Sequence, residues 1–232
     1  LHIHMRMIKD GKNMMMKDGR LSDDARRMIA GMMELAPSIT AFGNKNPTSY
    51  FRLVPHQEAP TNVCWGDRNR SVLLRVPLGW TAGVDMCNKA NPLEKAETPN
   101  ASFKQTVEIR SSDGSADLYQ LLAGLCVACR YGFEMPDALD IAKKTYVDVN
   151  IHDKENEGVL NHLSQLPDSC GASAACLEKQ RKVYEEQGVF SKDMIDGIID
   201  QLRSFNDTTL RKEVEGNSEE NLKLVERYFH CG

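Results

Sequence analysis

Three stretches of the chain alternate between apolar and polar residues, as a β-strand with one buried face does. They are LHIHMRMI at residues 1–8, the run SVLLRV at residues 71–76, and VEIR at residues 107–110. The first stretch leads into Lys9-Asp10-Gly11-Lys12, and Asp-Gly between strand-like runs favours a hairpin turn. The pattern therefore predicts short strands joined by tight turns.

Elsewhere the apolar residues recur every three to four positions, which is typical of amphipathic helices. The first such helix is predicted to begin after a Ser22 cap and to end before Pro37, with a loop over residues 38–50. Residues 79–101 have little periodicity and are predicted to form a long surface loop. After residue 115 the predicted helices are 116–131, 137–146, 154–166, 171–187, 191–204 and 218–229, with Ser191 and Ser218 as candidate caps. Strands followed by helices predict an α+β fold.

Composition narrows the class of protein. The 232 residues suffice for a buried core, and a net charge of -4 gives no support for nucleic-acid binding. No apolar run approaches the roughly 20 residues that span a bilayer, and no signal peptide is visible. Seven scattered cysteines, an odd number, argue against a disulfide framework. We therefore expect a cytoplasmic protein without nucleic-acid or membrane partners.

One cysteine pair could carry chemistry. Cys126 and Cys129 form a Cys-x-x-Cys sequence, which occurs in redox and zinc sites. The pair lies within an apolar run of helical spacing, and no second cysteine or histidine pair stands at zinc spacing. Buried helical thiols are the interpretation that the sequence favours.

A dense group of arginines surrounds a single carboxylate. Arg52, Arg68, Arg70 and Arg75 lie within the 28 residues from 50 to 77, together with Glu58. Guanidinium groups are permanently charged planar forks that bind carboxylate or phosphate oxygens in pairs. The group predicts a polyanion site, and its alternative is a solvated basic face.

The sequence partly predicts where these side chains lie. Strict alternation would place Arg70 on the face opposite Arg75, unless a turn or bulge intervenes. Glu58 lies between Pro55 and Pro60, which exclude a regular helix or an interior strand. We therefore expect Glu58 to be a loop carboxylate carried beside the arginines.

Two further pairs stand on strand-like segments. In a strand, His2 and His4 share one face, as a metal or phosphate site requires, although a surface or core-edge pair is the simpler alternative. Glu108 and Arg110 share one face of their strand in the same way. They suit a cleft that holds metal, nucleotide and substrate, and their alternative is a surface salt bridge.

These segments, in their order and spacing, resemble the signature of glutamine synthetases. The matching pieces are HIH at residues 2–4, RLVP from Arg52, EAP from Glu58, RNRS from Arg68, RVP from Arg75 and EIR from Glu108. The segments HQEAP, KQTVEIRSSDGSADLYQLLAGL and ERYFHCG are similar to the large type III form. The resemblance covers nearly the whole chain.

The resemblance implies a fold and an activity. Residues 1–135 would be the carboxy-terminal part of the catalytic domain, in which antiparallel strands flanked by helices form part of an active-site barrel, and residues 136–232 an all-helical extension. The activity would be ATP-dependent synthesis of glutamine from glutamate and ammonia through γ-glutamyl phosphate, in nitrogen assimilation. The implied cofactor is Mg²⁺ or Mn²⁺. The implied assembly is a homo-oligomer, a dodecamer of two hexameric rings.

The resemblance also implies roles for metal and nucleotide ligands. His2 and Glu108 would bind the metal ion that bridges the phosphates. His4, Arg70 and Arg75 would contact the phosphates of ATP. The family's hydroxyl residue two positions after the second histidine is replaced by Arg6, so nucleotide-base and ribose contacts are not assigned.

A second group of roles concerns the reacting carboxylate. Arg52 and Arg110 would hold glutamate and the developing phosphate. Glu58 would lie on a flap that closes over glutamate and helps to deprotonate ammonium. The catalytic residues implied are Glu58, Arg70 and Arg110.

Part of the implied site does not lie in this chain. In the family, the other metal-binding glutamates precede the His-x-His strand, and a small β-grasp domain of a neighbouring subunit completes each site. We therefore expect a fragment with little or no ligase activity alone. Alternatives are a γ-glutamylamine ligase, a non-catalytic assembly or regulatory subunit, and a simple phosphate-binding module, which would not need Glu58.

Overall fold

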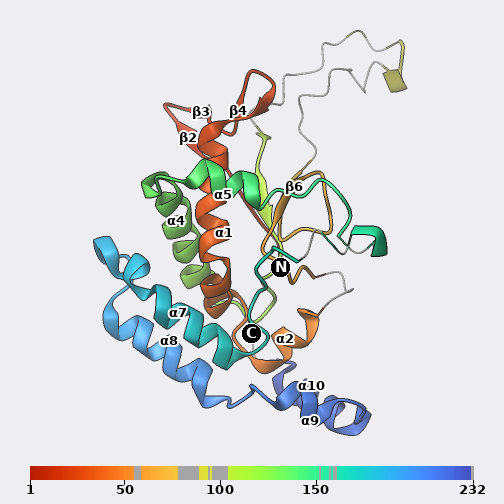
Figure 1. Ribbon diagram of the computed structural model, residues 1–232, viewed down its shortest axis with the longest axis vertical. Helices are drawn as coiled ribbons and strands as arrows, with labels where there is room; N and C mark the ends of the chain where they lie inside the picture. The colour runs from red at the N-terminus through yellow and green to blue at the C-terminus, as the bar shows by residue number, and fades with distance from the viewer. Residues whose placement is uncertain are drawn as a thin grey trace.

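A computed structural model describes residues 1–54, 59–77, 89–93, 95, 104–151, 153–156, 158 and 161–230. The long helix α1 (Asp23–Gly43) lies between the helix α4 (Leu118–Glu134) and a small β-sheet (Figure 1). The helices α7 (Cys170–Glu185) and α8 (Lys192–Ser204) pack beside them. The α+β class is confirmed. Most of the predicted loop 79–101 lies outside the described residues.

The sheet has four short strands in the order β1-β8-β7-β6. They are β1 (Ile3–Met5), β8 (Val107–Ile109), β7 (Leu74–Val76) and β6 (Trp65–Asp67). β8 pairs antiparallel with both of its neighbours, but β6 and β7 are parallel. The prediction of antiparallel strands is therefore wrong for this pair. Because both strands are short, residues 68–73 can bring the chain back so that Leu74, the first residue of β7, pairs with Trp65, the first residue of β6.

Two hairpins connect β1 to α1. Their strands are β2 (Ile8–Lys9) with β3 (Lys12–Asn13), and β4 (Met16–Lys17) with β5 (Arg20–Leu21). The predicted turn is confirmed at Asp10 and Gly11, whose φ angles of 50° and 73° are both positive. Such a turn matches the twist of a hairpin and explains the Asp-Gly sequence.

The helix α1 begins where the sequence predicts but ends later. The Ser22 hydroxyl accepts a hydrogen bond from the Ala25 N–H at 3.0 Å and caps the helix. The predicted end before Pro37 is wrong, because the helix continues to Gly43. Residues 38–43 are buried against other helices, and this packing outweighs the cost of an internal proline.

A second helix lies inside the predicted loop 38–50. The helix α2 (Pro47–Arg52) follows an Asn46 cap whose side chain accepts from the Ser49 N–H at 3.2 Å. Proline at the first helical position lacks only an N–H that has no partner there. This helix carries Arg52 toward the end of β8.

The carboxy-terminal part is largely helical, as predicted. Besides α4, α7 and α8 it contains α5 (Ala138–Lys144), η2 (Lys154–Asn156), η3 (Glu186–Gly188), α9 (Leu210–Val214) and α10 (Ser218–Tyr228). The cap at Ser191 is confirmed, whereas α10 is capped by Asn217 in place of Ser218. The helix α9 was not predicted.

The predicted helix 154–166 is wrong over its described second half. The Val63 N–H donates to the Ser164 carbonyl at 2.7 Å, and the Leu166 N–H donates to the Thr61 carbonyl at 2.8 Å. The backbone groups of Ser164 and Leu166 are thus satisfied by the segment before β6, so this part of the chain is extended and not helical.

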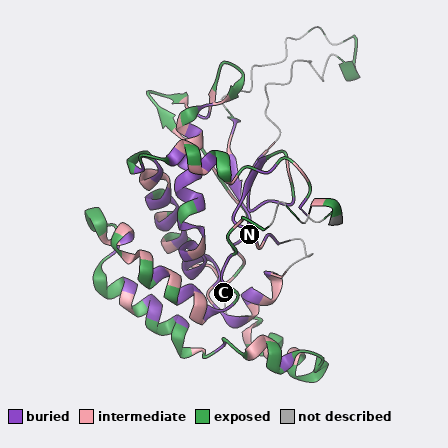
Figure 2. Cartoon of the chain, in the orientation of Figure 1, coloured by how far each residue is buried: buried purple, intermediate pink, exposed green. Residues whose placement is uncertain are grey.

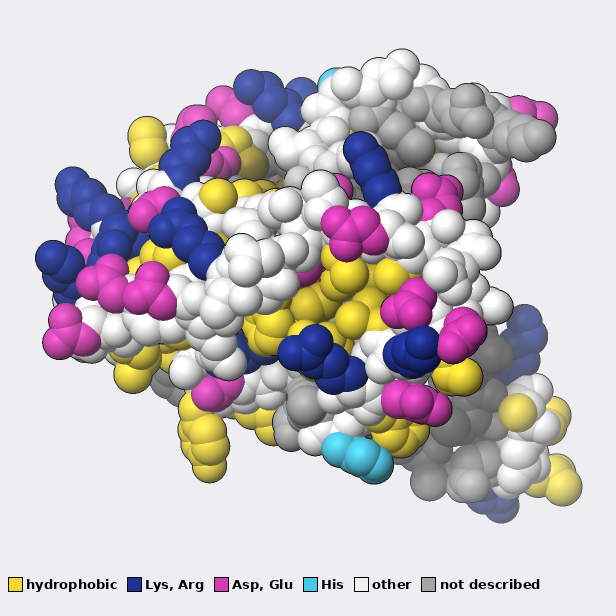
Figure 3. Space-filling view, turned by 90° about the horizontal axis from the view of Figure 1, so that it is seen from below, with side chains coloured by type: hydrophobic (Ala, Val, Ile, Leu, Met, Phe, Trp, Pro, Cys, Tyr) yellow, Lys and Arg dark blue, Asp and Glu magenta, His cyan; other side chains and the backbone are white. Residues whose placement is uncertain are grey.

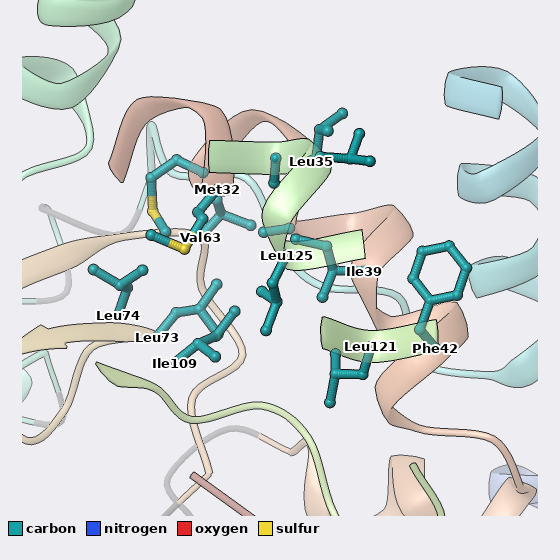
Figure 4. Packing of buried hydrophobic residues seen from close by; sticks show 14 of the residues in the cluster. Met32, Leu35, Ile39, Phe42, Val63, Leu73, Leu74, Ile109, Leu121 and Leu125 are labelled. Carbon is teal, nitrogen blue, oxygen red and sulfur yellow. The ribbon is translucent and has the colours of Figure 1, made fainter. Parts of the chain in front are cut away.

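One hydrophobic cluster joins the sheet to the helices. Leu73, Leu74 and Ile109 from the sheet region lie near Met32 of α1 and Leu125 of α4 (Figure 4). Burial is concentrated in α1 and the sheet, while the hairpins and outer helices are more exposed (Figure 2). The cluster draws side chains from both sides of residue 135, and the division at that residue remains a prediction.

The Cys-x-x-Cys pair lies on α4, as predicted, and both thiols are free. Cys129 is half-buried but Cys126 is exposed, so the prediction of two buried thiols is wrong for Cys126. The surface of Figure 3 shows basic and acidic side chains interspersed around apolar ones. Within the described ranges, no helix combines the length and the apolar composition of a membrane span.

Candidate functional site

The sheet aligns polar side chains from three of its strands in one row. Strand pairing sets His4 opposite Glu108, Glu108 opposite Arg75, and Arg75 opposite Gly66. Neighbouring residues in each strand point to the other face, where Ile109 and Leu74 belong to the core. Register therefore places the predicted His, Glu and Arg residues on the face turned away from the core.

Glu108 is the centre of this row. Its side chain is 2% exposed, and Oε1 lies 2.7 Å from His2 Nδ1 and 3.6 Å from His4 Nε2. Oε2 lies 2.6 Å from Arg75 Nε in an ion pair that lacks the alignment of a hydrogen bond. A buried carboxylate needs such an opposite charge, because desolvation otherwise makes its ionised form costly.

The two histidines have different surroundings. Burial lowers the pKa of His2 below 6.5, Glu108 opposes this change, and Arg110 adds to it. This direction favours the neutral form of the imidazole, which is the form that can ligate a metal ion. His4 Nδ1 lies 3.1 Å from the Thr106 hydroxyl, which orients its ring on the edge strand.

Two arginines are bound to backbone carbonyls near the end of β8. Arg110 is 5% exposed, and its Nη1 donates to the carbonyl of Arg70 and, at 3.4 Å, to that of Val72. Arg52 Nη2 donates to the carbonyl of Ser111 and, at 3.1 Å, to that of Ser112. These bonds connect α2 and the turn after β6 to the segment at the end of β8.

A cationic cavity lies beside the row. Its volume is about 600 Å³, and its lining residues are His4, Arg68, Arg70, Arg75, Pro77, Lys104 and Thr106. Three arginines and one lysine around one cavity favour a ligand with several negative charges. The sequence prediction of a polyanion site is consistent with this geometry.

Arg70 reaches the same cavity as Arg75 because it does not lie in the strand. β7 begins only at Leu74, and Arg70 belongs to the turn before it. The Asn69 side chain fixes this turn by accepting from the Ser71 N–H at 2.9 Å and donating to the Val149 carbonyl at 2.8 Å. The exception that the sequence left open, an intervening turn, therefore applies.

Arg68 is a lining residue to which the sequence reasoning gave no role. Its φ of 58° lies in the left-handed region, which residues other than glycine seldom occupy. Its N–H donates to the Val76 carbonyl at 2.8 Å, and its Nε lies 3.7 Å from Asp67. The Arg-Asn-Arg sequence indicated a further cation beside Arg70. The sequence did not predict the left-handed backbone angle of Arg68.

Glu58 and the flap predicted to carry it lie outside the described residues. His2 and Glu108 are in contact, as a shared ligand role requires. Throughout the part that the structure describes, no group of three or more His, Cys, Asp or Glu side chains has the arrangement of a metal site. The metal-ligand role of His2 and Glu108 therefore stays a prediction, with which their contact is compatible.

The sequence profile named "Glutamine synthetase, catalytic domain" matches residues 1–218. The chain belongs to the glutamine synthetase family. The resemblance drawn from the motifs is thus confirmed for the family, while the type III form rests on the sequence segments alone.

Curated members of this family align with almost the whole chain. Glutamine synthetase of Thermococcus kodakarensis is 31% identical over 232 residues, which are 99% of this chain and 47% of that protein. Glutamine synthetase of Azotobacter vinelandii is 31% identical over 216 residues, which are 91% of this chain and 40% of that protein. The chain spans about half the length of the curated glutamine synthetases that it matches.

Solved structures agree on the fold. A structure titled "Apo GmaS without ligand" matches with a TM-score of 0.61 at 21% identity, over 88% of this chain and 40% of that one. A second, titled "GmaS/ADP complex-Conformation 1", matches with a TM-score of 0.59 at 20% identity over 88% of this chain and 41% of that one. Both alignments cover under half of the longer protein.

Proposed function

We propose that this chain is the carboxy-terminal part of an ATP-dependent glutamate-ammonia ligase. The protein that contains it would form glutamine through γ-glutamyl phosphate and serve nitrogen assimilation. The observation that supports this most is the row of His4, Glu108 and Arg75 beside the cationic cavity. A triphosphate and a carboxylate are the ligands that such an arrangement suits.

The reaction explains why these residue types are needed. A carboxylate is a poor electrophile, so its oxygen first attacks the terminal phosphoryl group of ATP, and ammonia then displaces phosphate from the acyl phosphate. Negative charge is redistributed over phosphate oxygens during the transfer, and preorganised positive charge stabilises it. In this proposal Arg70, Arg75 and His4 contact the ATP phosphates.

A divalent ion, Mg²⁺ or Mn²⁺, would be held in part by His2 and Glu108. The test of fit is the pair itself, since a neutral imidazole nitrogen and a buried carboxylate oxygen lie 2.7 Å apart. When bound, the ion would neutralise phosphate charge. The remaining ligands would come from the part of the protein that precedes this chain, as in the family.

Glutamate would bind between Arg52 and Arg110. Both guanidinium groups are already held by backbone carbonyls of residues 70–72 or 111–112, so they need little reorganisation when a carboxylate or phosphate arrives. Glu58 would close over glutamate and accept a proton from ammonium. Excluding water in this way would protect the acyl phosphate from hydrolysis.

The proposal extends to architecture. The sheet would form part of an active-site barrel, residues 136–232 would be a helical extension, and the whole protein would assemble into two hexameric rings. This chain alone would have little or no ligase activity. A cytoplasmic location is supported by the free thiols of Cys64, Cys126, Cys129, Cys170 and Cys176.

The first experiment is to purify the protein from its native source and to measure its intact mass and its ATP-dependent formation of glutamine with Mg²⁺ or Mn²⁺. A mass well above 26.0 kDa with activity is expected. In that longer protein, Glu108→Gln should abolish phosphate release while Glu178→Gln on α7 leaves it unchanged. Activity in the isolated chain would contradict the fragment proposal.

Replacing ammonia by methylamine separates the closest alternative. A γ-glutamylamine ligase would release phosphate faster with methylamine than with ammonia, and the proposal expects the reverse. Absence of phosphate release with either amine in the longer protein would favour a non-catalytic subunit.

A further inference from the structure

We propose that this chain has a second ligand site, in which an anion with a flat aromatic body binds on the core side of the sheet. This inference stands independently of the proposed ligase activity. The site is a cavity of about 880 Å³ between the β4–β5 hairpin, the start of α1, the strand β6 and the helix α5. Sites for small organic molecules usually have volumes of about 300–1,000 Å³.

The cavity is distinct from the cationic cavity of the candidate active site. Trp65 and Val76, which line it, point to the face of the sheet opposite Arg75 and Gly66. The two cavities share lining residues at Arg68 and Pro77. Where they meet at β7 and at residues 104–106, alternate residues face the two cavities: Val76 and Gln105 line this one, and Arg75, Lys104 and Thr106 line the other.

The inner wall is apolar. Trp65, Val76 and Ala142 are buried there, and the half-buried Met16 and Leu139 extend the wall. Such a surface favours burial of a carbon ring by the hydrophobic effect.

Two aromatic rings form one side of the cavity. The indole N–H of Trp65 donates to the Ala142 carbonyl at 2.6 Å, so this polar group is already satisfied. The Tyr146 ring lies 4.8 Å from the Trp65 ring, at 60° to it, and is 41% exposed. The exposed ring of Tyr146 can pack against a planar ligand.

The rim of the cavity determines the sign of the ligand charge. The cations that line the cavity are Arg20, Arg26, Arg68 and Lys143. Two of them already lie near carboxylates, Arg26 Nη1 at 3.2 Å from Asp23 Oδ1 and Arg68 Nε at 3.7 Å from Asp67 Oδ2.

The side chains of the other two cations, Arg20 and Lys143, have no hydrogen-bond or ion-pair partner among the described residues, and neither has the carboxylate of Asp140. Two cations against one carboxylate leave a positive excess, so an anionic group is preferred over a cationic one.

The test uses two probes of the same shape and different charge. Naphthalene-1-acetate carries one negative charge, and naphthalene-1-acetamide is its neutral analogue. Binding of each to the chain is measured by isothermal titration calorimetry at low salt. The acetate should bind about fivefold to tenfold more tightly, as two exposed ion pairs would allow.

Variants locate the binding. Arg20→Gln combined with Lys143→Gln should bring the affinity for the acetate to that for the acetamide. Lys179→Gln combined with Lys182→Gln on α7 changes the net charge equally and should leave both affinities unchanged. Tyr146→Ala should weaken both probes alike, because it removes part of the apolar wall.

Three results would overturn the proposal. They are equal affinity of the two probes for the unsubstituted chain, unchanged acetate binding in the Arg20 and Lys143 double variant, and loss of binding in Arg70→Gln. The last would place the probe in the cationic cavity instead. Circular dichroism of each variant distinguishes lost binding from lost folding.

Discussion

At the scale of single residues, the site depends on one buried carboxylate and on the cations that face it. Glu108 holds Arg75 on one side and His2 on the other, whereas Arg70 is exposed in a turn. The sequence motifs predicted roles for all four of these residues. They predicted no role for Arg68, because its left-handed backbone angle depends on the hydrogen bond that its N–H donates to the Val76 carbonyl.

Arg75→Gln should destabilise the fold more than Arg70→Gln does. Removing Arg75 leaves the carboxylate of Glu108 buried without its guanidinium partner, at a cost of about 2 kcal/mol. Removing the exposed Arg70 should change the unfolding free energy by less than about 0.5 kcal/mol. Urea denaturation of both variants measures the difference, and equal midpoints would show that Glu108 does not depend on Arg75.

The cysteines provide a second contrast between residues. Cys126 is exposed, whereas burial raises the pKa of Cys64 to about 11, so Cys64 remains a protonated thiol at pH 8. Cys126→Ser should therefore remove one equivalent of fast labelling by a thiol reagent at that pH. Cys64→Ser should leave the fast phase unchanged, and a lost fast equivalent in Cys64→Ser would show that this thiol is accessible.

At the scale of elements, local patterns predicted the strands and most of the helices, because burial of one face imposes a period of two or of 3.6 residues. The failures occur where distant packing decides. Residues 38–43 stay helical past Pro37 because they are buried, and Ser164 pairs with Val63 in place of a helical partner. The residues that bury 38–43 and the Val63 partner of Ser164 are distant in sequence, so local periodicity could not predict either feature.

The crossing of α1 and α4 depends on two glycines. A Cβ at Gly31 would overlap the Ala128 carbonyl, and one at Gly132 would overlap the Arg27 carbonyl. Gly31→Ala should therefore destabilise the fold by about 1–3 kcal/mol, since two helix backbones must move apart.

Gly197 provides the matched control within α8. No atom lies within 4 Å of a Cβ added there, so Gly197→Ala should stabilise the helix by up to about 1 kcal/mol. Thermal unfolding of both alanine variants gives the comparison, and a stabilised Gly31→Ala would exclude close contact of the helices.

At the scale of the whole molecule, we propose that the chain provides one part of a larger site. It spans about half of its curated relatives, and its described residues bring two expected metal ligands together, His2 and Glu108. That further metal ligands lie elsewhere in the protein stays a prediction of the sequence resemblance.

Metal affinity measures how much of the site this chain holds. Calorimetric titration with Mn²⁺ should show that the isolated chain binds at least about a hundredfold more weakly than the longer native protein, because affinity rises steeply with the number of charged ligands. His2→Gln should weaken the residual binding, and His162→Gln should not. Equal affinities would mean that the isolated chain already contains the whole metal site.

Because β1 lies at the edge of the sheet, the candidate site should open more readily than the whole fold unfolds. Within the described residues, this strand has three residues and pairs only with β8. Fraying of such an edge requires far less free energy than global unfolding. Each opening would withdraw both imidazoles and leave Glu108 with Arg75, so on warming the chain should lose these predicted metal ligands while its core remains intact. Amide exchange at Ile3 and Met5 that is faster than at Glu108 and Arg110, whose N–H groups face β7, would record that early loss.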